Sequence, residues 1–255
     1  MPAHHSPITA RNHDVPTPQG CGTGGPRGVD GEDPLERCIG AVQSLSFPIW
    51  RKTWFMLGLR RLQSPSQPNG RRMDLVEIAP PDYDVSIALA YATADNVTGA
   101  PIYRYPRCYL HREAADCLAK VVRLAAVLGY RLKIFDAFRP SEAQWILWKQ
   151  FPLPDFFADP RKGSPHSRGV AVDLTLIDGQ GIELEMGTGF DDLTSRAHHA
   201  CADVSPAAQR NRALLLGLMT AGGWDFYRNE WWHYQLFNAR RYPLYSDSAL
   251  QRGLM

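Results

Sequence analysis

The sequence has no long hydrophobic run and no strong excess of charge of either sign. A membrane-spanning helix needs roughly 20 apolar residues, and Arg51 and Lys52 interrupt the most apolar candidate, residues 47–59. The formal net charge is only +2, which favours neither nucleic acid nor a membrane surface as a partner. The first residues lack the apolar segment that a secretory signal contains. We therefore expect a protein that binds neither nucleic acid nor membranes.

Cysteine is scarce and shows no pattern. The chain has five cysteines, an odd number, and no Cys-x-x-Cys pair. This usage excludes a disulfide framework and a cysteine zinc site. Such cysteine usage is typical of proteins in a reducing compartment, so we expect a cytoplasmic protein.

The first 72 residues differ in composition from the rest. Residues 1–34 contain six prolines and six glycines and show no apolar periodicity, which predicts disorder. Residues 35–63 are more apolar and favour a short helix, and residues 64–70 are typical of a linker. We interpret residues 1–72 as a disordered or dispensable extension and residues 73–255 as the working domain. The alternative is that the extension is a small regulatory or docking arm.

From residue 73 onward, helical and strand periodicities are mixed. Helices are expected at residues 111–128, 141–148 and 205–222. Strands are expected at residues 85–91, 132–135, 170–176 and 231–237. Gly129 is placed to end the first helix, and Ser141 opens a capping-box signature for the second. Because no regular βαβ rhythm is present, we predict an α+β domain with a mostly antiparallel central sheet flanked by helices.

A first candidate site lies in the segment from Ser164 to Asp173. Alternation along the predicted strand places Asp173 on a face of small residues, opposite the apolar face. His166 precedes it by seven residues, about 23 Å if the chain were extended. A turn through Gly169 would bring the imidazole back beside the carboxylate, and glycine is the residue type that such a turn requires. A histidine and an aspartate within reach of each other suit zinc.

A second candidate site lies in the segment Glu230 to Tyr234. His233 is a candidate third ligand, which would leave one tetrahedral position open, as a catalytic zinc site requires. Glu230 would lie near the metal but not on it. Trp231 and Trp232 would partly desolvate its carboxylate and raise its pKa toward the range of a general base.

Arg139 follows a predicted strand end and precedes a predicted helix. A guanidinium in that position is a natural partner for a developing oxyanion. Each of these signals has an ordinary structural alternative. A single histidine is more often a satisfied structural residue, Asp173 could be a buried hydrogen-bonding acid, and Arg139 could be part of a structural ion pair.

Together, the pattern Ser-x-His-x-x-Gly-x-Ala-x-Asp and the later Glu-x-x-His resemble a family of zinc peptidases. That family includes VanX-type D-alanyl-D-alanine dipeptidases, peptidoglycan D,D-carboxypeptidases and hedgehog-like domains. Longer strings resemble the dipeptidase branch, and the resemblance spans roughly residues 73–244. These strings are His166–Gly169 with Asp173–Leu176, Met186-Gly187 with Phe190-Asp191, Arg196 with His198-His199, Tyr91–Thr93 with Asp95-Asn96 and Thr98-Gly99, and Glu230–Tyr234.

The resemblance implies a hedgehog-like or D,D-peptidase-like fold and one Zn²⁺ per subunit. It implies hydrolysis of the D-alanyl-D-alanine dipeptide to two D-alanines, with a small dipeptide as the partner. The residues it assigns are the metal ligands His166, Asp173 and His233, the general base Glu230, the transition-state stabiliser Arg139, and the ammonium-binding group Asp191, Tyr91 and Ser164.

Two departures from the family pattern bear on fine substrate preference. Pro165 stands where relatives carry Ser or Asn, and Phe138 replaces a Tyr often found before the arginine. Two alternative functions remain open at this stage. One is a carboxypeptidase or endopeptidase that trims peptidoglycan, and the other is a zinc-bearing binding domain without turnover.

Overall fold

The computed structural model describes residues 74–255, to which the fold and the site below belong. The predicted disordered extension, the short helix at 35–63 and the linker at 64–70 lie outside the described residues. The domain start at residue 73 therefore stays a prediction.

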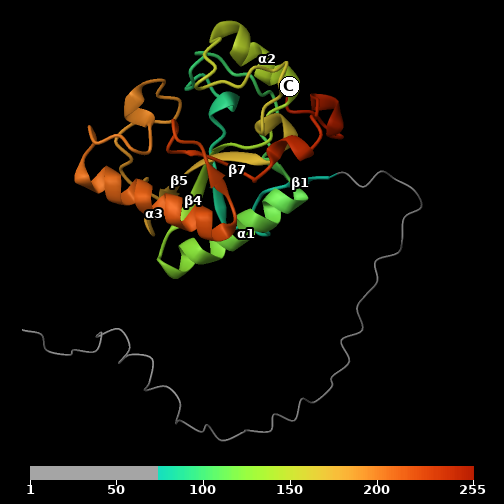
Figure 1. Cartoon of the computed structure of the whole chain (residues 1–255). Helices are drawn as coiled ribbons and strands as arrows, with labels where there is room; N and C mark the ends of the chain where they lie inside the picture. Colours follow the sequence, from blue (N-terminus) through green and yellow to red (C-terminus); the bar gives the residue numbers. More distant parts are fainter. Residues whose placement is uncertain (1–73) are drawn as a thin grey trace, which may run out of the picture. The chain divides into compact units, whose positions relative to one another are not determined.

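The described chain is a mixture of helices and short strands (Figure 1). The helices are α1 (Arg112–Val127), α2 (Ser141–Gln150) and α3 (Pro206–Gly222). The strands are β1 (Leu75–Glu77), β2 (Val85–Ile87), β3 (Tyr109–His111), β4 (Arg131–Asp136), β5 (Ala171–Ile177), β6 (Asp225–Phe226) and β7 (His233–Gln235). None of the helices within residues 74–255 has the length and apolarity to cross a bilayer.

The central sheet has five strands in the order β2-β4-β5-β7-β6. Strands β2 and β4 run parallel, whereas the pairs β4-β5, β5-β7 and β7-β6 are antiparallel. Strands β1 and β3 form a separate antiparallel pair. The prediction of an α+β fold with a mostly antiparallel sheet is therefore confirmed.

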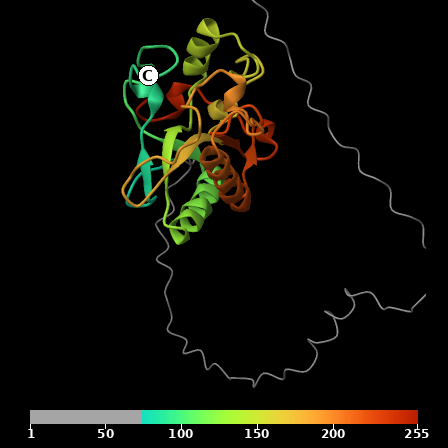
Figure 2. The same cartoon turned by 90° about the vertical axis from the view of Figure 1, so that its left-hand side faces the viewer.

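Helices α1 and α3 pack against each other on one side of the sheet, and α2 lies on the other side (Figures 1 and 2). Most of the apolar stripe predicted for α1 is buried, namely Ala114, Ala115, Leu118, Val121 and Ala125, whereas Val122 is partly buried and Leu128 is exposed. Gly129 follows the helix in the left-handed conformation (φ 79°). Helix α3 begins as expected, because the side chain of Ser205 accepts a hydrogen bond from the backbone N–H of Ala208.

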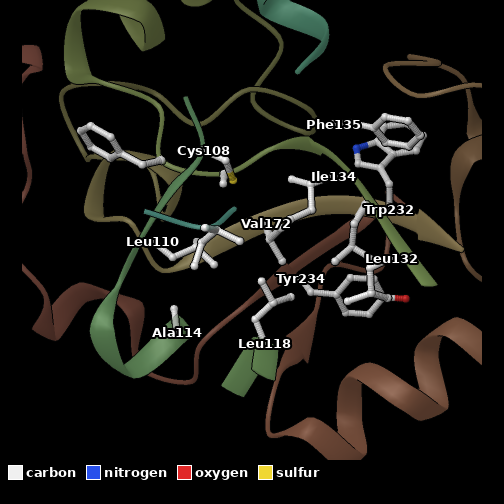
Figure 3. Close-up of a cluster of buried hydrophobic side chains, with 14 of the residues drawn as sticks. Cys108, Leu110, Ala114, Leu118, Leu132, Ile134, Phe135, Val172, Trp232 and Tyr234 are labelled. Carbon is white, nitrogen blue, oxygen red and sulfur yellow. The ribbon is translucent and has the colours of Figure 1, made fainter. Parts of the chain in front are cut away.

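The hydrophobic core fills the space between the sheet and α1 (Figure 3). Val172 of β5 and Tyr234 of β7 contribute to it, together with Leu118 of α1. Since side chains alternate along a strand, the neighbours Asp173 and His233 must point to the opposite face of the sheet. The core therefore fixes which face of the sheet carries the polar groups.

Three predicted elements differ in detail from the structure. Ser141 is not a capping residue: Pro140 occupies the N-cap of α2, and the Ser141 hydroxyl instead donates to the carbonyl of Tyr245, 104 residues away. The strand expected at residues 85–91 ends at Ile87, because the chain turns into a short 3₁₀ helix, Ala90–Ala92. The strand expected at residues 231–237 is limited to His233–Gln235, the part in ladder register with β5.

Gly169 is the position at which backbone conformation most constrains the site. It adopts φ 68°, and a Cβ there would lie 2.6 Å from Leu75 Cδ2 and 3.0 Å from the backbone nitrogen of His111. We expect Gly169→Ala to lower the free energy of unfolding by about 1–3 kcal/mol. Urea denaturation measures this change. Gly179→Ala, with open space around the new methyl group, is the matched control and should stay within about 0.5 kcal/mol of the wild type.

Candidate active site

Three acidic or basic side chains form a row across neighbouring strands. In the register of the sheet, Asp136 at the end of β4 pairs with Asp173 of β5, and Asp173 pairs with His233 of β7. Directly opposed residues in antiparallel strands have Cβ atoms about 4.5–5.5 Å apart. All three side chains are buried, on the face of the sheet that points away from α1 and α3. The sheet register therefore brings together residues almost 100 positions apart.

His166 reaches this row from a 3₁₀ turn, His166–Arg168, which Gly169 ends. Its Nε2 lies 3.3 Å from Asp173 Oδ2 and 3.1 Å from His233 Nδ1. His233 Nδ1 lies 3.0 Å from Asp173 Oδ1. The predicted turn and the return of the imidazole to the carboxylate are confirmed.

His166, Asp173 and His233 each offer one ligand atom, and these atoms all lie within 4.8 Å of one another. Two imidazole nitrogens and one carboxylate oxygen are a donor set that suits a divalent transition metal with a vacant coordination position. The structure thus brings the three predicted ligands together as a group that could hold a metal ion.

Both imidazoles are oriented by contacts on their far sides. His166 Nδ1–H donates to the carbonyl oxygen of Ala137 at 2.7 Å, so the lone pair of Nε2 faces the cluster. His233 Nε2–H donates to Gln235 Oε1 at 3.3 Å, which leaves Nδ1 facing the cluster. Such outer contacts fix the tautomer and the ring orientation of metal-ligating histidines.

The carboxyl group of Asp173 is held ionised. Burial alone would raise its pKa, but the interactions with His166 and His233 outweigh burial, and the pKa lies below its ordinary value. An ionised carboxylate is the form that coordinates a metal.

Glu230 lies beside the three-residue cluster, in the turn that precedes β7. Its Oε2 is 3.8 Å from His233 Nδ1, and the side chain is buried. Burial raises the pKa of Glu230 well above its ordinary value, and the charges of Asp173 and Asp191 act in the same direction. A carboxyl group with a raised pKa, next to a candidate metal site but not part of it, suits proton transfer.

Arg139 is buried and held by four groups. Its Nε donates to Asp136 Oδ2 at 2.8 Å and its Nη1 to Gln144 Oε1 at 3.0 Å. Its Nη2 lies 3.5 Å from Asp173 Oδ2. The guanidinium also stacks over the ring of Tyr91, with Cζ 4.9 Å from the ring centroid. These contacts fix the orientation of the guanidinium, which lines the same cavity as the cluster.

Asp191 lies on a loop in the left-handed conformation, with φ 58°. It accepts a hydrogen bond from the Tyr91 hydroxyl at 2.9 Å. Burial raises the pKa of Asp191 to about 7.

Tyr91 is fully buried and does not line the cavity, so it reaches the site only through Asp191 and Arg139. Ser164 lines the cavity, and its hydroxyl accepts a hydrogen bond from the backbone N–H of His166 at 3.2 Å.

The three candidate ligands, Glu230, Arg139, Asp191 and Ser164 line one small cavity of about 190 Å³. Aromatic and apolar walls surround the polar groups, a composition typical of small-molecule sites. The lining residues are Arg139, Pro154, Phe156, Phe157, Ala158, Ser164, Pro165, His166, Asp173, Asp191, Leu193, Tyr227, Glu230, Trp232, His233 and Gln235.

Sequence reasoning missed Asp136 and Gln144, which hold Arg139. Asp136 is fully buried, and its other oxygen accepts a hydrogen bond from Tyr103 at 2.9 Å. Its place three residues before Arg139, at the end of a predicted strand, was an available signal. Gln144 gave no such signal, because its position suggested only the start of a helix.

The chain is similar in sequence to known proteins. A family model described as D-ala-D-ala dipeptidase matches residues 71–251. The chain is 48% identical over 174 residues to the D-alanyl-D-alanine dipeptidase of Escherichia coli (strain K12), covering 68% of this chain and 90% of that protein. It is 39% identical over 167 residues to the D-alanyl-D-alanine dipeptidase of Enterococcus faecium, covering 57% and 83%. A solved structure of the LdcB LD-carboxypeptidase matches with 18% identity and a TM-score of 0.40, covering 68% and 73%.

The ligand geometry predicts that a metal ion stabilises the folded chain. At a free Zn²⁺ concentration of about 100 times Kd, the free energy of unfolding should rise by about 2.7 kcal/mol. Asp173→Asn should remove most of this gain, since it removes the anionic ligand. Thermal unfolding with and without Zn²⁺ measures the effect. Asp178→Asn, which keeps the Oδ1 acceptor of its surface turn, should retain the full gain, and equal gains in both variants would contradict the site.

Proposed function

The chain belongs to the D-Ala-D-Ala dipeptidase family of metallopeptidases, and we propose that it hydrolyses the D-alanyl-D-alanine dipeptide to two D-alanines in this cavity. His166, Asp173 and His233 would hold one Zn²⁺ per subunit. The observation that carries this proposal is the convergence of their three ligand atoms within 4.8 Å of one another, beside the buried carboxyl group of Glu230.

When bound, zinc supplies Lewis acidity and lowers the pKa of water to about 7. Glu230 is the general base in this proposal. Its carboxylate takes a proton from the attacking water and returns that proton to the amine that leaves when the peptide bond breaks. The position of Glu230 close to His233, without being a ligand itself, allows it to act on a water beside the metal site.

Arg139 stabilises the negative charge that develops on the carbonyl oxygen of the scissile bond. Asp136 and Gln144 engage Nε and Nη1, so the guanidinium is already oriented before the substrate arrives. A charged donor fixed in advance, in a site that excludes water, stabilises a developing oxyanion without reorganisation.

Asp191 sets the length of the substrate. Its half-buried carboxylate pairs with the free ammonium of a dipeptide, and Tyr91 holds it from behind. Ser164 lines the same cavity and contributes a hydroxyl group. An acylated or longer chain has no ammonium at this position, so it would leave the carboxylate without a partner and be rejected.

We further propose a cytoplasmic location, on the basis of cysteine usage. Cys108, Cys117 and Cys201, the cysteines within residues 74–255, are all free thiols. Free thiols are typical of reducing compartments.

Glu230→Gln tests the general base. It should slow turnover of D-Ala-D-Ala by about 10²–10⁴-fold, while zinc remains bound at one per chain, because the ligands are intact. Steady-state kinetics and metal analysis of the same preparation measure both quantities. Glu183→Gln, an exposed glutamate that pairs with Lys133, is the control and should keep wild-type turnover. Near-normal turnover in Glu230→Gln would exclude this role.

Recognition of the substrate amino group is tested first by acetylating the substrate and then by substituting Asp191. N-acetyl-D-Ala-D-Ala should be cleaved far more slowly than the free dipeptide. Asp191→Asn should lower kcat/KM for the free dipeptide by about 10- to 100-fold, and have little effect on the acetylated one. Asp192→Asn keeps the Oδ1 acceptor that serves Thr194 and should behave as the wild type. Equal cleavage of both substrates by the wild type would refute the ammonium pocket.

A further inference from the structure

Arg212 of α3 is a buried arginine whose hydrogen-bond partners within residues 74–255 are carbonyls and not carboxylates. Only 2% of its surface is exposed. Burying a guanidinium costs several kcal/mol unless hydrogen bonds replace its water shell. Its donors must therefore be satisfied by other groups.

All three guanidinium nitrogens donate to backbone carbonyls. Nε donates to Met186 O at 2.7 Å, Nη2 to Arg196 O at 2.9 Å and Nη1 to His198 O at 2.9 Å. Met186 stands at one end of a loop, and Arg196 and His198 stand at the other. One side chain therefore closes the loop of residues 186–198 at both ends.

The loop that Arg212 closes carries the proposed ammonium-binding residue. Asp191 lies near its middle, in the left-handed conformation that few residues other than glycine adopt. Leu193 of the same loop lines the cavity. Apart from a short 3₁₀ turn, Ser195–Ala197, the loop has no regular secondary structure to hold it. Its shape depends on side-chain contacts.

Other contacts hold the loop at individual points. At one end, the backbone N–H of Trp231 donates to the carbonyl of Ala197 at 3.0 Å, and Asp191 itself accepts from Tyr91. The ring of Phe190 packs against Phe135, Tyr91 and Trp232. Trp231 Nε1 donates to Thr188 Oγ1 at 2.8 Å. These contacts anchor one side of the loop to the sheet. The planar fork of Arg212 bonds both ends of the loop at once, which lysine cannot reproduce with one nitrogen.

We propose that Arg212 is a positioning residue for recognition of the substrate amino group, acting through Asp191. By fixing both ends of the loop, it holds the Asp191 carboxylate at the distance from the metal site that a dipeptide requires. This inference rests on the proposed function, because it assumes that Asp191 binds the ammonium of the substrate. It explains why a charge is buried where an apolar residue would be easier to accommodate.

Arg212→Lys is the test variant, and Arg210→Lys, an exposed position on the same helix, is the matched control. A misplaced binding group far from the reacting atoms can cost up to about 100-fold. We therefore expect Arg212→Lys to raise KM for D-Ala-D-Ala by about 10- to 100-fold, with kcat within about threefold of the wild type and zinc still at one per chain. Arg210→Lys should match the wild type in both constants.

A double-mutant cycle with Asp191→Asn separates positioning from general stability. If Arg212 acts through Asp191, Arg212→Lys should add almost nothing to the KM of Asp191→Asn. Independent, multiplying effects would overturn the inference, as would a loss of kcat and zinc with KM unchanged. A wild-type protein that leaves D-Ala-D-Ala intact would instead refute the proposed function, before any variant is compared.

Discussion

The site depends on the register between β4, β5 and β7. Asp136, Asp173 and His233 stand opposite one another on a single face, and the core residues Val172 and Tyr234 occupy the other. A slip of one residue in either pairing would turn a charged side chain into the core and an apolar one into the cavity. The free energy gained by burying the apolar face of the sheet therefore also holds the candidate ligands in position.

The cavity and its immediate support gather more negative than positive charge. Asp136, Asp173, Asp191 and Glu230 surround one guanidinium, that of Arg139. The raised pKa values of Asp191 and Glu230 reflect both burial and mutual repulsion among these acids. A divalent cation and a substrate ammonium have the charge that offsets this excess. This charge balance, together with the size of the cavity, supports the selectivity for a small cationic end group that we propose.

Much of this arrangement could be predicted from the sequence, because its determinants are local. Helix α1 follows from apolar periodicity, helix α3 from Ser205 and Pro206, and the return of His166 toward Asp173 from Gly169. What the sequence could not reveal depends on distant partners. The Ser141 hydroxyl is taken by a carbonyl 104 residues away, and Arg212 binds carbonyls 14 to 26 residues away in a loop without periodicity. Asp136 and Gln144 lie only three and five residues from Arg139, but which side chains turn toward the guanidinium depends on how the end of β4 and the start of α2 pack.

One side-chain amide connects the wall of the cavity to Arg139. Gln144 accepts from Arg139 Nη1 through Oε1, and its Nε2 donates to the carbonyl of Ala158 at 2.8 Å, in the segment that lines the cavity. Turning the amide over would break both bonds together. A change of length or sequence around Ala158 therefore alters the guanidinium as well as the fit of the substrate. Under the proposed function, a substitution that reshapes this wall for another substrate would thus also disturb the residue that stabilises the transition state.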